Sequence, residues 1–72
     1  MATVDQNIGE IDVVSFKEQV GRWPAGTTGT VVMDFGNQKM VEVSNPLGEA
    51  LDLPIVAATN LDLVEKHRPS RA

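Results

Sequence analysis

Two runs of alternating apolar residues flank the dipeptide Gly36-Asn37 and predict a β-hairpin, which is the feature that most constrains the fold of this chain. The first run covers residues 28–35 and the second covers residues 39–44, and both show the period of two that is typical of a β-strand. Turn-forming residues between two such runs are a strong hairpin signal. The alternation predicts that one face of the hairpin lies in the core, with the side chains of Val31, Met33, Phe35, Val41 and Val43.

Shorter elements are predicted on either side of this hairpin. Residues 17–27 contain glycines and a proline that interrupt a strand, so they predict a long loop, and residues 45–48 fit a type I turn. Residues 57–60 predict a single helical turn. Pro54 has no N–H to donate, so the strand around it must be an edge strand or carry a bulge. We therefore expect five strands, over residues 11–16, 28–35, 39–44, 50–55 and 61–64.

This order of elements predicts an all-β fold. No segment sustains an apolar period of 3.6 residues over three turns, which argues against a helical bundle. A long loop after the first strand and a short helical turn before the last favour a small five-stranded SH3-like barrel, with an OB-like barrel as the alternative. We expect a flexible leader over residues 1–9, the barrel over residues 10–66 and a flexible basic tail over residues 67–72.

The charge distribution limits the classes of partner. The 72 residues carry a formal net charge of −4, and all ten acidic residues lie within residues 5–65. Lys66, Arg68 and Arg71 lie in the last seven positions, where we expect a solvated end rather than a binding arm. Because an acidic body repels phosphate backbones, we expect no general binding of nucleic acid. The absence of cysteine, of a signal peptide and of a membrane-spanning run predicts a cytoplasmic protein without a membrane partner.

Four short motifs carry a family resemblance. They are Asp12-Val13-Val14, Gly26-Thr27-Thr28-Gly29-Thr30-Val31-Val32, Val41-Glu42-Val43 and Ala58-Thr59-Asn60-Leu61. Together they resemble a family of small bacterial proteins of unknown function that have an SH3-like barrel. The resemblance implies this fold and a role in docking onto a larger protein. Members sometimes accompany toxin and immunity genes, which implies an accessory or immunity/antitoxin-like role. Val43 stands where an aromatic residue is common in the family.

No catalytic constellation is apparent in the sequence, so we expect neither an enzyme nor a cofactor. A nucleophile needs a nearby base, but the only imidazole, His67, lies in the predicted tail. Asp34 and Glu42 fall on the outward face of the predicted hairpin, where they could act as an acid–base pair or serve only as solvated charges. Two carboxylates alone make a poor metal site. The glycines of residues 26–29 lack the lysine and the following helix of a phosphate-binding loop and are explained as a turn.

Three residues are the strongest candidates for binding a partner. Trp23, the only tryptophan, could anchor a partner through the long loop or could cover one end of the barrel. Val32 and Met40 are out of phase with the predicted core face, so they could begin an apolar contact patch or be single exposed residues. With the two carboxylates, the candidate partner-binding set is Trp23, Val32, Asp34, Met40 and Glu42.

These observations favour a non-catalytic module that binds another protein or a second copy of itself. The acidic body would suit a basic partner. A small barrel that associates with nucleic acid through the basic tail is the alternative. A domain that binds a small molecule or acts as an enzyme is the third hypothesis.

Overall fold

The structure, a computed structural model, describes residues 8–67 and is all-β. Six strands form one antiparallel sheet, and a single 3₁₀ turn precedes the last strand. The elements in chain order are β1 (Val13–Phe16), β2 (Thr28–Asp34), β3 (Gln38–Ser44), β4 (Ala50–Asp52), β5 (Ile55–Ala57), η1 (Ala58–Asn60) and β6 (Leu61–Glu65).

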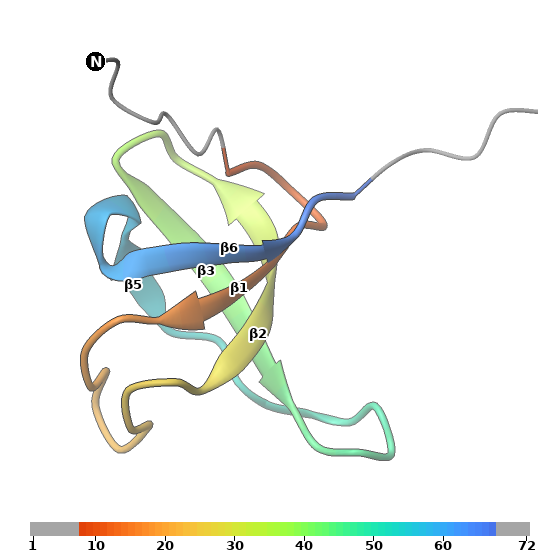
Figure 1. Ribbon diagram of the computed structural model, residues 1–72. Coiled ribbons are helices and arrows are strands. Elements are labelled where there is room, and N and C mark those ends of the chain that lie inside the picture. The colour runs from red at the N-terminus through yellow and green to blue at the C-terminus, as the bar shows by residue number, and fades with distance from the viewer. Residues whose placement is uncertain (1–7, 68–72) are drawn as a thin grey trace, which may run out of the picture.

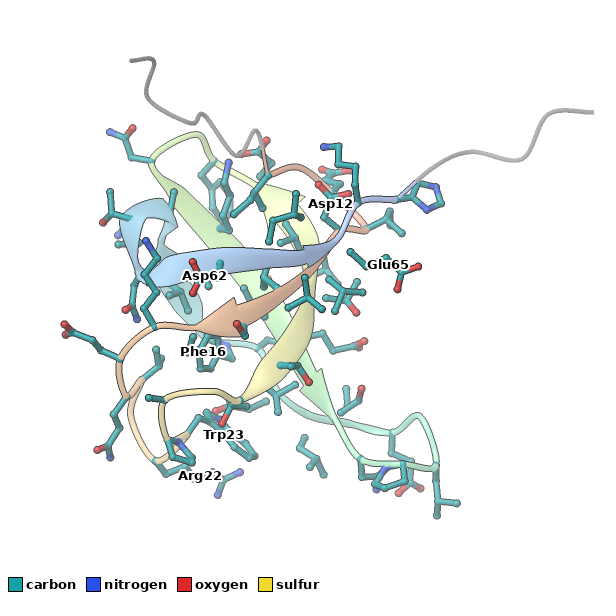
Figure 2. All side chains as sticks on the ribbon, viewed as in Figure 1. Asp12, Phe16, Arg22, Trp23, Asp62 and Glu65 are labelled. Atoms are coloured by element: carbon teal, nitrogen blue, oxygen red, sulfur yellow. The ribbon has the colours of Figure 1, made fainter. Side chains whose placement is uncertain are left out.

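The sheet has the strand order β4-β3-β2-β1-β6, and β5 also pairs with β3. Figure 1 shows that the sheet is strongly bent, so that β1 and β6 pass in front of β3. Within residues 8–67, the strand pairings do not close the sheet on itself. The core lies inside the bend, and Figure 2 shows Phe16 pointing into it from β1.

The structure has six strands rather than the five expected, because the predicted strand over residues 50–55 is divided at Pro54. β4 and β5 both pair with β3, through Val43 with Asp52 and Met40 with Ile55, and together they form one interrupted edge. Pro54 lacks an N–H, but its carbonyl oxygen accepts a hydrogen bond of 2.9 Å from the Val41 N–H. The edge position that the proline predicted is therefore confirmed.

The predicted turns are also present. The Phe35 N–H donates to the Gln38 carbonyl across the two-residue hairpin loop, and Gly36 adopts a φ of 88°. In the turn after β3, the Gly48 N–H donates to the Asn45 carbonyl. η1 confirms the helical turn expected before the last strand.

Eight apolar side chains form the core, and they come from both ends of the described chain as well as from its middle. Val31, Val41 and Val43 are buried as the alternation predicted. Ile8 is also buried, although it falls in the segment expected to be a flexible leader. Residues 1–7 of the expected leader and residues 68–72 of the expected tail lie outside the described residues. Within residues 8–67, the core consists of Ile8, Val14, Phe16, Val31, Val41, Val43, Val56 and Leu61.

A β-bulge in β2 overturns the core prediction for Met33 and Phe35. Val31 pairs with Val41 and Met33 pairs with Met40, the neighbouring residue of β3, so Val32 is one extra residue of β2 without a partner of its own in β3. The additional residue moves the following side chains to the other face of the sheet. Met33 and Phe35 are consequently exposed, by 45 % and 52 % respectively.

Gly29 is required by the close approach of β2 to β3 rather than by a turn. A Cβ atom at this position would lie 2.6 Å from both the Glu42 carbonyl oxygen and the Val41 Cγ1 atom. Gly26, in contrast, has a φ of 91°, which confirms the turn expected there.

We predict that Gly29→Ala lowers the free energy of unfolding by about 2 kcal/mol, because the added methyl group overlaps backbone that cannot move aside. Gly9→Ala is the control, since the nearest atom to its added Cβ is the Lys66 Nζ at 4.0 Å. Chemical denaturation of both variants measures the difference. Equal stabilities for the two variants would contradict the close approach of β2 and β3.

Candidate functional site

A row of apolar side chains crosses the face of the sheet that points away from the core. Met33 on β2 pairs with Met40 on β3, and Met40 in turn pairs with Ile55 on β5. Residues directly opposite one another in a sheet point to the same face and lie within contact of their neighbours. Met40, a half-buried residue, thus lies between two exposed apolar neighbours.

This row is the centre of a larger apolar surface, which we call the outer face. Phe35 lies two residues beyond Met33 on the same side of β2. Leu51 and Leu53 flank Asp52 at the interrupted edge, and both are about half exposed. We define the outer face as Met33, Met40 and Ile55 of this row, Phe35 beyond it, and the two exposed leucines of the adjoining edge, Leu51 and Leu53.

The extent of the outer face is unusual relative to the core. Eight large apolar side chains of the described residues are exposed, as many as the eight that are buried. Five of the exposed ones belong to the outer face, and each is between 45 % and 52 % exposed. Single exposed apolar residues are normal, whereas a contiguous patch of this kind marks an interaction surface.

An open hollow adjoins the outer face at the end of the β2–β3 hairpin. Its volume is about 630 Å³, and Phe35 lies on one side of it. Small or polar residues form the remainder, namely Gly36, Asn37, Gln38, Ala57, Ala58 and Thr59. An exposed aromatic ring beside small side chains leaves room for a bulky apolar group.

The structure does not bring the two candidate carboxylates together. Asp34 pairs with Lys39, which is buried on the core side of β3, and Lys39 Nζ lies 2.6 Å from Asp34 Oδ1. This hydrogen bond holds the pKa of Asp34 below its ordinary value. Glu42 pairs with Thr30 and belongs to the opposite face of the sheet, because it alternates with the buried residues Val41 and Val43. The expectation that both acids share the outward face is therefore wrong for Asp34, and the bulge in β2 is the reason.

Trp23 lies at the end of the core and is held there by polar contacts. Its side chain packs against the core residues, and its Nε1–H donates a hydrogen bond of 2.8 Å to Asp52 Oδ2. Arg22 stacks over the indole ring, 4.8 Å from its centroid, and Figure 2 shows the two side chains together in the long loop. The hydrogen bond from Trp23 also lowers the pKa of Asp52. Trp23 thus covers one end of the core, and its use as an anchor for a partner stays a prediction.

The remaining candidates, Val32 and Met40, occupy neighbouring positions. Met40 is central to the outer face, and Val32 is the half-buried extra residue of the bulge beside it. The sequence did not point to Met33 or Phe35, because a strict period of two placed both in the core. The sequence does contain a signal for the exposure of Leu51 and Leu53. Both alternate with Asp52, and an edge strand of an antiparallel sheet commonly exposes one face to solvent.

The sequence also did not predict a buried carboxylate at the opposite end of the molecule. Asp12 is 1 % exposed and accepts hydrogen bonds from Lys66 Nζ at 2.8 Å, from the Gly9 N–H at 2.8 Å and from the His67 N–H at 2.6 Å. Burial alone would raise the pKa of Asp12, but these hydrogen bonds outweigh it and lower the pKa from 3.8 to about 2. Asp12 alternates with Val14 and Phe16 in the sequence, which was the available signal for its burial.

Residues 8–67 contain neither a metal-binding cluster nor a membrane-spanning helix. No group of three or more His, Cys, Asp or Glu side chains in this range could hold a metal ion. None of the helical segments in the same range has the length and apolar character needed to cross a bilayer.

Comparison of the chain with protein-family models, with curated protein sequences and with solved structures finds no significant match. The family resemblance inferred from the four motifs stays a prediction of the sequence.

We predict that Asp12 contributes about 2 kcal/mol to the free energy of unfolding at neutral pH, because its pKa falls by about two units on folding. Since the folded pKa is the lower one, this contribution is complete above about pH 4 and is lost as the pH falls to about 2. Urea denaturation between pH 2 and 6 measures it, and Asp12→Asn should abolish this part of the pH dependence. An unchanged pH dependence in the variant would contradict the assignment.

Proposed function

We propose that this chain is a non-catalytic protein-interaction module with the architecture of an SH3-like barrel. The single observation that carries the functional part is the outer face, on which five large apolar side chains are about half exposed beside Met40. A patch of this kind is energetically unfavourable in water unless another surface covers it.

Three features of the topology support the SH3-like architecture. The first strand pairs with both the second and the last strand, a long loop joins β1 to β2, and η1 leads directly into β6. The bend of the sheet brings β1 and β6 across from β3, as in a small barrel (Figure 1).

The carboxylates support a binding role over acid–base catalysis. A general acid or base works best with a pKa near the operating pH. Asp12, Asp34 and Asp52 each have a lowered pKa, so each is an ionised group held by donors of the protein itself. Such a module fits the accessory or immunity/antitoxin-like role in a bacterial cytoplasm that the family resemblance implies.

We predict that the double variant Met33→Thr/Ile55→Thr binds the partner at least about tenfold more weakly, which corresponds to about 1.4 kcal/mol. Threonine removes apolar area but retains a high preference for strands, so the fold should persist. The full chain captures the partner from a lysate of its own source, mass spectrometry identifies it, and calorimetry with the purified partner measures the affinity.

Val64→Thr is the matched control, because Val64 is 55 % exposed and lies on β6, away from the outer face. Its affinity for the partner should equal that of the wild type. Equal binding by the double variant and the wild type would refute the outer face as the binding surface.

A further inference from the structure

The charged residues of the segment that forms the outer face are almost all acidic. Between residues 28 and 60 the sequence contains a single basic residue, Lys39. Its side chain is buried on the core side of β3 and paired with Asp34, so it does not reach the outer face. The acidic residues of the same segment are Asp34, Glu42, Glu49 and Asp52.

Glu42 is the charged residue of β3 that shares a face with Met40 at the apolar centre of the outer face. It lies two residues from Met40 along β3 and points to the same side of the sheet. Glu42 is already half-buried. It takes part in none of the ion pairs of the described residues, which join Lys17, Lys39 and Lys66 to other carboxylates. A protein that covers Met40 must therefore remove much of the remaining water from the Glu42 carboxylate.

Removing water from a carboxylate is costly unless a cation or several hydrogen-bond donors replace that water. The described residues of the outer face supply no cation to Glu42, so the partner must supply one. Lysine and arginine are the side chains suited to this contact, and arginine can donate two parallel hydrogen bonds.

The hollow beside Phe35 provides the second recognition point. It lies at the hairpin end of the outer face and is lined by Phe35 and by small residues that include Ala57 and Ala58. Gln38, which lines the hollow, lies four residues before Glu42 in β3, a separation of about 14 Å at about 3.4 Å per residue. A bulky apolar side chain seated in such a pocket is the usual energetic centre of an interface.

The charge pattern also decides against a second copy of this chain as the occupant. Two outer faces packed against each other would bury two Glu42 carboxylates, and residues 28–60 of the second copy would bring no accessible cation to either. A pairing through these residues alone leaves both charges without compensation, which is unfavourable.

We propose that the partner is a different protein, one that presents a bulky apolar side chain to the hollow beside Phe35 and a lysine or arginine to Glu42, about 14 Å apart. This inference rests on the proposed function, because it specifies what the outer face binds. The central contacts are apolar, and the cation gives orientation and selectivity.

The test compares charge variants in calorimetry with the purified partner. Glu42→Gln should weaken binding about tenfold and Glu42→Lys by at least about a hundredfold, because the second change also adds repulsion. Phe35→Ala should weaken binding about tenfold through loss of the anchor site. Glu65→Lys is the control for the change in net charge, since Glu65 is exposed on β6, and its binding should change less than about threefold. Chemical denaturation of each variant confirms that the fold is retained.

The outcomes separate this inference from the proposed function. If Met33→Thr/Ile55→Thr weakens binding while Glu42→Lys behaves like Glu65→Lys, the cationic partner is refuted and the binding surface stands. If none of the variants weakens binding, the proposed function fails as well.

Sedimentation of the chain alone provides the last comparison: a dimer that dissociates in the Met33→Thr/Ile55→Thr variant would identify a second copy as the occupant and overturn the inference. A monomeric chain that captures no protein from the lysate, even at low salt, would contradict both proposals.

Discussion

The bulge at Val32 is the structural feature on which the rest of this molecule depends. One extra residue in β2 leaves Val31 in the core but moves Met33 and Phe35 to the outer face. The core thereby loses two of its largest expected side chains, and the opposite surface gains them. The same insertion separates Asp34 from Glu42, so that Asp34 pairs with Lys39 while Glu42 pairs with Thr30 on the face that carries Met40.

A core reduced in this way needs other sources of stability. The eight buried side chains include five valines, which bury less area each than leucine or phenylalanine. Asp12 compensates in part, because it joins Gly9, at the start of the described chain, to Lys66 and His67 at its end. Gly29 allows β2 and β3 to approach closely. The net charge of −4 opposes the aggregation that an exposed apolar surface would otherwise favour.

The sequence predicted the features that local chemistry determines and failed where distant contacts decide. Gly36-Asn37 placed the hairpin, and Pro54 marked an edge of the sheet. The bulge has no comparable signal, because a period of two continues through residues 31–35 whether or not a residue is inserted. The polar contacts of Asp12 with Lys66 and of Trp23 with Asp52 join residues 54 and 29 positions apart, which no local pattern specifies.

The most direct test of this account is paramagnetic broadening of the methionine methyl signals in the full chain, recorded alone and with the purified partner. Met33 and Met40 both lie on the outer face, so the two methyl groups report on it without any substitution. The account predicts strong broadening of the Met33 signal by a soluble paramagnetic agent in the free chain, and loss of that broadening in the complex. A Met33 methyl group protected in the free chain would contradict the bulge, and broadening that persists in the complex would contradict the outer face as the binding surface.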